Sequence, residues 1–205
     1  MDSIRIFGYK SFKKLSVQLH PINLLIGANG AGKSNFLSLF EMLGNIYEKR
    51  LGAYVAQVGG VDKLLYQGRK VTDRIAVNLL IAKSEYDLAL LESDGKLIVE
   101  REVVGCYDDV CSLDLVRKNV ITEFQSESSL KDHKEEDLSN YISQIRKFHF
   151  HDTGRRSPFT ADSHIVNDAY RMYEHGENLA AILYRIQREK PMAYRRIIRV
   201  IQSVA

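Results

Sequence analysis

The first residues of the chain alternate between apolar and polar side chains. Residues 3–9 place Ile4 and Ile6 on one face, and residues 15–19 alternate again before a turn at Pro21. A period of two is typical of a strand that buries one face. The pattern therefore predicts two strands, paired as a hairpin, at the start of the chain.

An apolar run and then a helical pattern follow this hairpin. Residues 21–26, Pro-Ile-Asn-Leu-Leu-Ile, have the length and composition of a buried strand that ends at Gly27. Beyond residue 33, apolar side chains recur at the spacing of a helix with one buried face. These side chains are Phe36, Leu37, Leu39, Phe40, Leu43, Ile46 and Tyr47. We expect a strand, a glycine-rich loop and a helix, in that order.

The middle of the chain has the pattern of an antiparallel meander. An irregular stretch over residues 52–68 precedes an alternating segment at 74–82, and two further segments, 86–92 and 96–104, flank Asp-Gly at 94–95. Asp-Gly between alternating segments is a strong hairpin signal. The pattern predicts antiparallel strands rather than parallel strands joined by crossover helices.

The last third of the chain ends in two predicted helices. Residues 127–140 are crowded with charge and read as a solvated helix or loop, and residues 142–150 read as a strand that ends in a polar turn. A loop over residues 155–162 follows. Helices are then expected over residues 177–189 and from Pro191 onward, since proline suits the first turn of a helix.

Composition sets limits on the class of protein. The chain has 205 residues, of which 45% are hydrophobic, so it can bury one sizeable core and is most simply one domain. Its net charge of +3 permits contact with nucleic acid through a local patch but does not argue for it. No apolar run is long enough for a membrane span and no signal-peptide pattern opens the chain, so we expect a cytoplasmic protein without a membrane partner. Cys106 and Cys111 lack further ligands nearby and are expected to be free thiols.

The most informative motif lies between the apolar run and the first helix. Residues 27–34 read Gly-Ala-Asn-Gly-Ala-Gly-Lys-Ser, a complete Gly-x-x-x-x-Gly-Lys-Ser/Thr phosphate-binding loop. We expect Gly27, Gly30 and Gly32 to take positive φ angles and to let the backbone approach phosphate oxygens. A Gly-rich turn that matched by accident would lack the flanking strand and helix, so the context favours binding of ATP or GTP.

The chemistry of each loop residue indicates its role. The amides of residues 29–34 would converge on the β-phosphate at the positive end of the helix dipole. Lys33 would bring its charge to the β- and γ-phosphates, and the Ser34 hydroxyl is a suitable ligand for Mg²⁺. The expected nucleotide-binding residues are Gly27, Ala28, Asn29, Gly30, Ala31, Gly32, Lys33, Ser34 and Asn35. The cofactors that this loop predicts are ATP and Mg²⁺.

The segments around the loop resemble a known family. Ile6 followed by Tyr-Lys-Ser-Phe at 9–12, and Asn-Leu-Leu-Ile at 23–26, look like the start of an ABC-type ATPase head. The branch is the RecF-like and structural-maintenance-of-chromosomes group, which includes the overcoming-lysogenization-defect nucleases. Within it, His-Phe-His-Asp-Thr at 149–153 and the run at 176–186 are similar to prokaryotic predicted AAA-type ATPases, some of which act in anti-phage defence.

The resemblance implies an α/β P-loop NTPase fold with an antiparallel β-subdomain and C-terminal helices. Residues 1–50 would hold the first strands, the phosphate loop and its helix, and residues 51–104 a loop and the β-meander. Residues 105–162 would form a variable segment, a strand and a polar turn, and residues 163–205 the closing helices. Family heads pair around two ATP molecules, so the resemblance implies a second head as partner, with DNA and an effector nuclease as further candidates.

Two family elements are missing from the sequence. We find neither a Leu-Ser-x-Gly-type signature nor an apolar strand that ends in two acidic residues. Residues 88–92 imitate the acidic strand, but the Asp-Gly turn at 94–95 makes them one arm of a hairpin. We therefore expect the chain to be the N-terminal lobe of a longer ATPase, with little or no ATP hydrolysis by itself.

The family places a Mg²⁺-reaching Gln where this chain has His151 and Asp152. Asp152 is thus a catalytic candidate beside Lys33, since a carboxylate oxygen suits Mg²⁺, although an Asp that caps a turn fits equally well. His149 and His151 would share one face of a strand, but no third metal ligand is in view.

The basic residues outside the phosphate loop are compatible either with ligand binding or with simple exposure to solvent. Lys10 and Ser11, with Lys13, resemble the family segment that approaches the nucleotide, and a solvated basic loop is equally compatible. Lys63, Arg69 and Lys70 are candidate DNA contacts, as is a C-terminal basic run, whereas basic helix faces are usually just solvated. That run consists of Arg185, Arg188, Lys190, Arg195, Arg196 and Arg199.

The function that these patterns favour is a nucleotide-driven dimer switch in DNA maintenance or phage defence. Two alternatives stay open at this point. A small P-loop kinase would need parallel βα units and an arginine-bearing lid soon after the loop. A non-catalytic module would bind nucleotide only to shape a surface for a partner.

Overall fold

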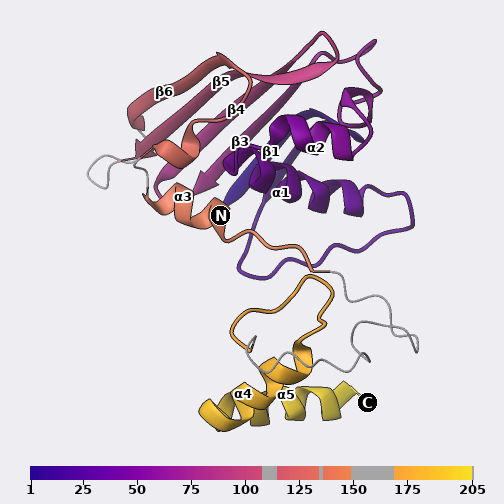
Figure 1. Cartoon of the computed structure of the whole chain (residues 1–205), viewed down its shortest axis with the longest axis vertical. Coiled ribbons are helices and arrows are strands. Elements are labelled where there is room, and N and C mark those ends of the chain that lie inside the picture. The colour runs from indigo at the N-terminus through magenta and orange to yellow at the C-terminus, as the bar shows by residue number, and fades with distance from the viewer. Residues whose placement is uncertain (108–114, 134–135, 149–168, 205) are drawn as a thin grey trace. The chain divides into compact units, whose positions relative to one another are not determined.

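A computed structural model describes residues 1–107, 115–133, 136–148 and 169–204 of the chain. The chain divides into two compact units, Met1–Ile145 and Arg146–Ala205. The first unit contains an antiparallel sheet with helices, and the second contains a pair of helices (Figure 1). In the part of the chain that the structure describes, no helix has the length and apolar character needed to cross a membrane.

The sheet of the first unit has six strands in the order β2-β1-β3-β4-β5-β6, and each neighbouring pair is antiparallel. The strands are β1 (Ser3–Tyr9), β2 (Phe12–Gln18), β3 (Arg74–Ile81), β4 (Ser84–Ser93), β5 (Lys96–Tyr107) and β6 (Leu115–Gln125). The predicted hairpin and meander are therefore confirmed. The predicted turn between β4 and β5 is confirmed as well, because Asp94 and Gly95 both have positive φ angles, 51° and 77°.

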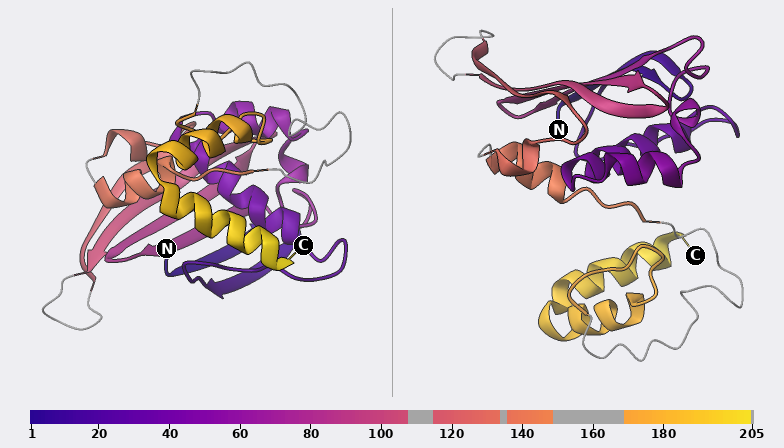
Figure 2. Two further views of the ribbon diagram at one scale, coloured as in Figure 1. Left: turned by 90° about the horizontal axis from the view of Figure 1, so that it is seen from below. Right: turned by 45° about the horizontal axis from the view of Figure 1, so that its top comes forward.

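Helices cover one face of this sheet (Figure 2). They are α1 (Lys33–Tyr47), α2 (Leu51–Gln57), η1 (Val61–Lys63), η2 (Leu130–Asp132) and α3 (Glu136–Ser143). The predicted stripe of α1 is buried at Leu39, Leu43 and Ile46, whereas Leu37 is 49% exposed. The buried face of the sheet packs on this stripe through alternate residues such as Ile4 and Ile6, so the core lies between the sheet and α1.

Residues 21–26 do not form the predicted strand. They have no regular secondary structure, and Ile22, Leu24 and Ile26 are 89%, 81% and 83% exposed. An extended run becomes a strand only when a neighbour pairs with its backbone. Here β1 is already paired on both sides, by β2 and β3.

Three further segments differ from expectation. The stretch 52–68, predicted to be irregular, includes most of α2, because Leu51, Tyr54 and Val55 bury one helix face. The segment 127–140 is not simply solvated, since Leu138 of α3 is fully buried. The strand predicted over residues 142–150 is wrong for its described part, because α3 extends to residue 143 and 144–148 have no regular structure.

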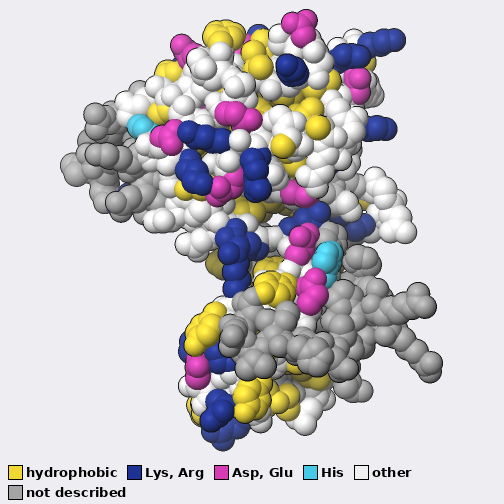
Figure 3. Space-filling model, viewed as in Figure 1, with side chains coloured by type: hydrophobic (Ala, Val, Ile, Leu, Met, Phe, Trp, Pro, Cys, Tyr) yellow, Lys and Arg dark blue, Asp and Glu magenta, His cyan; other side chains and the backbone are white. Residues whose placement is uncertain are grey.

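The second unit contains α4 (Leu179–Glu189) and α5 (Pro191–Val204), close to the predicted bounds, with Pro191 at the first position of α5. Asn178 organises the preceding loop: its Oδ1 accepts a bond from the amide of Tyr173 (2.9 Å), and its Nδ2 donates to the carbonyl of Arg171 (2.7 Å). No side chain of α4 is buried, and hydrophobic side chains reach the surface of this unit (Figure 3).

Candidate nucleotide-binding site

The phosphate loop turns sharply into α1. Gly30 and Gly32 have φ angles of 83° and 94°, as predicted, whereas Gly27 lies outside the left-handed region and that expectation was wrong. Gly32 precedes the first residue of α1. A Cβ at Gly32 would lie 3.1 Å from Ser11 Oγ and 3.3 Å from the Phe12 ring. Glycine at this position satisfies both the backbone conformation and the close packing.

The start of α1 presents backbone donors. Within the described chain, no hydrogen bond is formed by the amides of Gly30, Gly32, Lys33 or Ser34. The first amides of any helix lack partners within the helix, and together with the helix dipole they attract an anion. The loop therefore offers the donor set that a phosphate group needs.

The Lys33 side chain folds over the loop. Its Nζ donates hydrogen bonds to the carbonyl oxygens of Gly27 (2.6 Å) and Ala28 (2.8 Å). Ser34, the predicted Mg²⁺ ligand, is exposed at the start of α1. The ammonium group, the exposed hydroxyl and the amides named above thus lie on one short segment of chain.

The turn between β1 and β2 packs against the first turns of α1. Asn35 Nδ2 donates to Ser11 Oγ (3.0 Å), and Lys10 Nζ donates to Ser38 Oγ (2.8 Å). The Tyr9 hydroxyl shares a further hydrogen bond with Ser38 Oγ (2.9 Å), and burial raises the pKa of Tyr9 above its ordinary value. The structure therefore places Lys10 and Ser11 against the loop helix, and their contact with a nucleotide stays a prediction.

A polar cavity of about 780 Å³ adjoins this turn. Its lining residues are Lys10, Asn35, Val58, Asp62, Lys63, Leu65, Gln67, Gly68, Arg69 and Lys70. It forms because the chain after η1 folds back on the end of β1, where the amide of Lys10 donates to the carbonyl of Leu64 (2.7 Å) and that of Tyr66 donates to the carbonyl of Gly8 (2.9 Å). The sequence did not predict this cavity, because no local pattern signals that pairing.

Other candidate residues of the sequence lie outside the described residues. This applies to Asp152, to His149 and His151, and to Cys111. Cys106 lies on β5, and the expectation of two free thiols stays a prediction because Cys111 lies outside the described residues. Among the residues whose placement is described, no three His, Cys, Asp or Glu side chains gather into a metal site.

Comparison with known proteins decides the family. Residues 1–177 match the protein family described as "AAA ATPase domain". The chain belongs to this family. A search of curated proteins found no match.

Membership in the AAA ATPase domain family implies nucleotide binding, with ATP and usually Mg²⁺ as the ligands. The residues fit such a ligand: the amides at the start of α1 can donate to phosphate oxygens, a Cβ at Gly32 would crowd Ser11 and Phe12, and Ser34 offers a hard oxygen for Mg²⁺.

Proposed function

We propose that this protein is the ATP-binding lobe of an ABC-type ATPase head of the RecF-like and structural-maintenance-of-chromosomes branch, working in the cytoplasm as a nucleotide-driven switch. The observation that carries the proposal is the phosphate loop at the start of α1, with its unbonded amides and with the ammonium of Lys33 held at the carbonyls of Gly27 and Ala28. Phosphoryl groups are held by this combination of amides, charge and Mg²⁺. The antiparallel pairing of all the described strands speaks against a small P-loop kinase, which needs parallel βα units.

Association with a second head is part of the proposal. The three exposed apolar side chains before the loop, Ile22, Leu24 and Ile26, support it. Neighbouring apolar side chains that face solvent mark a surface that another element covers. In heads of the ABC type, bound ATP joins two copies of the fold. We propose DNA maintenance or anti-phage defence as the pathway, with an effector nuclease as the downstream partner.

Contact with DNA is a further proposal, favoured by the polar cavity beside α1. Four cations line it, Lys10, Lys63, Arg69 and Lys70, against the single carboxylate of Asp62. That carboxylate already pairs with Arg69 Nε at 3.4 Å. A local cluster of this kind holds phosphates through its field, without reading sequence. On the face shown in Figure 3, basic and acidic side chains of the first unit are mixed, so any such contact is local.

Equilibrium binding of Mg²⁺-ATP tests the proposal. Wild-type protein should bind, the Lys33→Ala variant should not bind measurably, and Lys96→Ala, which removes a lysine of β5 that is not part of the phosphate loop, should bind as wild type does. A wild-type protein without affinity for Mg²⁺-ATP would overturn the proposed function.

A further inference from the structure

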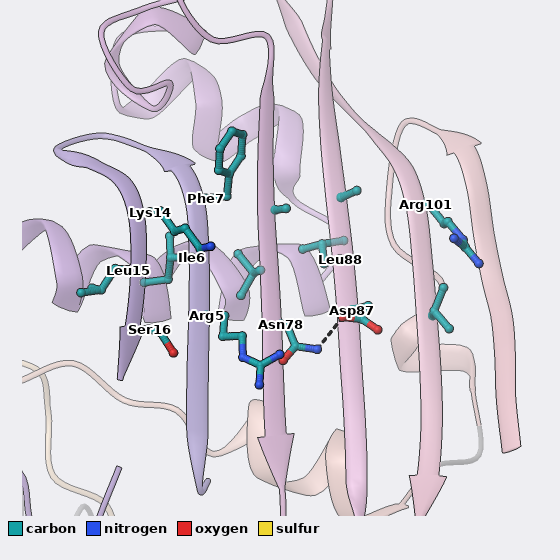
Figure 4. Close-up of a pocket in the computed structure, with 14 residues that line it drawn as sticks. Arg5, Ile6, Phe7, Lys14, Leu15, Ser16, Asn78, Asp87, Leu88 and Arg101 are labelled. Atoms are coloured by element: carbon teal, nitrogen blue, oxygen red, sulfur yellow. Dashed lines mark hydrogen bonds between the residues drawn. The ribbon is translucent and has the colours of Figure 1, made fainter. Parts of the chain in front are cut away.

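The face of the sheet opposite the helices holds a second cavity, of about 350 Å³ (Figure 4). This is within the usual volume range for a bound small ligand or a single ligand moiety, roughly 300–1,000 Å³. Two rows of side chains that run across the strands build it. The strand registers give their order, and no residue of the phosphate loop belongs to either row.

The first row has a cation at each end. In register across β2, β1, β3, β4 and β5 it consists of Lys14, Phe7, Ala76, Ala89 and Arg101. The small side chains of the two alanines leave space above β3 and β4, and the longer side chains of Phe7 and Arg101 lie on either side of this space. Neighbouring strands lie about 4.8 Å apart, so Lys14 and Arg101 are separated by roughly 19 Å.

The second row carries groups that form hydrogen bonds. In the same order it consists of Ser16, Arg5, Asn78, Asp87 and Val103. Asn78 Nδ2 donates to Asp87 Oδ1 (2.5 Å) and to Glu85 Oε1 (2.7 Å), which fixes the amide in place. Figure 4 shows the Arg5 guanidinium beside Asn78.

Two properties of these rows point to a ligand. Phe7 leaves 45% of its surface exposed, although it lies in the middle of β1, a strand paired on both sides. In addition, Arg5, Lys14 and Arg101 form no ion pair with any residue that the structure describes, whereas Arg74 on β3 is paired with Glu100 at 2.7 Å. An exposed ring among unpaired cations suits a ligand that has both flat apolar surfaces and negative charges.

We propose that this face of the sheet binds single-stranded nucleic acid, with one base stacked on Phe7 and backbone phosphates held by Arg101, Lys14 and Arg5. Stacking of bases on exposed aromatic side chains, next to cations that follow the backbone, is how single strands bind to protein surfaces. Ser16 and Asn78 face the edge of the stacked base. A duplex is excluded from this arrangement, because its base faces are covered by neighbouring bases.

The spacing of the cations favours a strand over a free nucleotide. Lys14 and Arg101 stand at opposite ends of the first row, so one phosphate cannot contact both. Successive phosphates of one nucleic-acid strand can reach Lys14 and Arg101, while a base between these phosphates lies above Ala76 and Ala89. The cavity thus takes one unit of a longer strand.

Fluorescence anisotropy of the full chain with a labelled oligothymidylate of about 12 nucleotides tests the proposal, since single-strand sites span about 4–16 nucleotides. Phe7→Leu keeps an apolar side chain but removes the ring, and should weaken binding by about fivefold or more. Arg101→Gln should weaken binding and lower the slope of log affinity against log salt by about 0.7. Lys96→Gln, on the same strand as Arg101 but outside the cavity, should leave affinity unchanged.

Phe7→Leu and Arg101→Gln should both bind Mg²⁺-ATP as the wild-type protein does, which controls for folding. Unlabelled single strand should displace the probe, whereas duplex DNA and thymidine monophosphate at equal nucleotide concentration should not. The proposal is overturned if the oligonucleotide fails to bind at low salt, if either variant binds it as tightly as wild type, or if duplex or mononucleotide competes equally well.

Discussion

Asn35 on α1 donates a hydrogen bond of 3.0 Å to the hydroxyl of Ser11, in the turn between β1 and β2. Asn35 follows directly on the last residue of the phosphate loop, so this bond ties the β-hairpin to the loop helix. The same turn packs against Gly32, whose missing side chain leaves room for Ser11 and Phe12. The position of the loop is therefore set by the hairpin as well as by its own glycines.

The first prediction concerns this bond. Ser11→Ala should lower the free energy of unfolding by about 1 kcal/mol, the usual net contribution of one hydrogen bond. It should also weaken Mg²⁺-ATP binding severalfold, because Asn35 loses its anchor. Urea denaturation and calorimetry measure the two effects, and Ser16→Ala on β2 is the control. Equal nucleotide affinities of the two variants would show that the turn does not position α1.

Gly32→Ala should lower the free energy of unfolding much more than an alanine substitution within α1 does. Gly32 has a φ angle of 94°, and a Cβ there meets Ser11 Oγ at 3.1 Å, so we expect a loss of about 1–3 kcal/mol in the free energy of unfolding. Gly44 is the matched control: it lies within α1 with open space around its Cα, and alanine there should stabilise the protein by about 0.5–1 kcal/mol. Urea unfolding of both variants checks this. A neutral Gly32→Ala would contradict the geometry of the loop.

Stability should fall at high pH. Burial, together with the neighbouring Glu102 carboxylate that accepts its hydrogen bond, raises the pKa of Tyr86 well above its usual 10.0, and burial also raises the pKa of Tyr54. Above about pH 10 the unfolded chain releases these protons while the folded chain keeps them, so the free energy of unfolding decreases as pH rises. Urea midpoints between pH 8 and pH 11 measure the effect. At pH 8 Tyr86→Phe should be less stable than the wild type, because Glu102 loses a hydrogen-bond donor. Its free energy of unfolding should then decrease less as pH rises, and an equal decrease in both proteins would contradict this account.

ATP hydrolysis by this chain should be very slow. Positioning and charge stabilisation supply nearly all the acceleration of phosphoryl transfer, and no signature or acidic strand is recognisable in the sequence. ATP joins two ABC-type heads only when a signature motif of one head holds the γ-phosphate bound to the other. No such motif is recognisable in residues 1–205, so ATP should not change the sedimentation coefficient of this chain by itself, and the proposed pairing requires a head that carries the motif. A phosphate-release assay that found about one turnover per second in wild type, abolished by Lys33→Ala, would contradict this expectation and point to an unrecognised carboxylate as the base.

Much of the sheet and the loop could be read from the sequence, because those features are local. Ile75, Val77 and Leu79 occupy alternate positions because one face of their strand is buried. Asp94 and Gly95 form a turn because both residues adopt positive φ angles readily. The apolar run at 21–26 was misread because a strand requires a partner that no local pattern supplies. β6 was not predicted, since its apolar residues, Leu115, Val116, Val120, Ile121 and Phe124, do not alternate with polar ones. The charged segment before α3 was misjudged, because its docking depends on the buried carboxylate of Glu102.

That carboxylate illustrates what sequence patterns leave out. Glu102 lies on the buried face of β5 and is fully buried. It accepts hydrogen bonds from the hydroxyls of Tyr86 (2.5 Å), Thr122 (2.8 Å) and Ser128 (2.6 Å), and from the amide of Ser129 (3.0 Å). Four donors from three separate segments satisfy one buried charge, as the cost of burying it requires. The polar cavity beside α1 is non-local in the same way, because it forms where Leu64 and Tyr66 bond to the end of β1.

The most direct test of this account is calorimetric titration of Mg²⁺-ATP into the wild-type protein and into Lys33→Ala, with Lys96→Ala as the control. One charge-assisted phosphate contact contributes about 1.5–3 kcal/mol, so Lys33→Ala should lose affinity by at least roughly 10- to 150-fold. We expect saturable binding at one site in the wild type and the control, and no measurable heat of binding in Lys33→Ala. Unchanged affinity in Lys33→Ala would contradict the assignment of residues 27–34 as the nucleotide site.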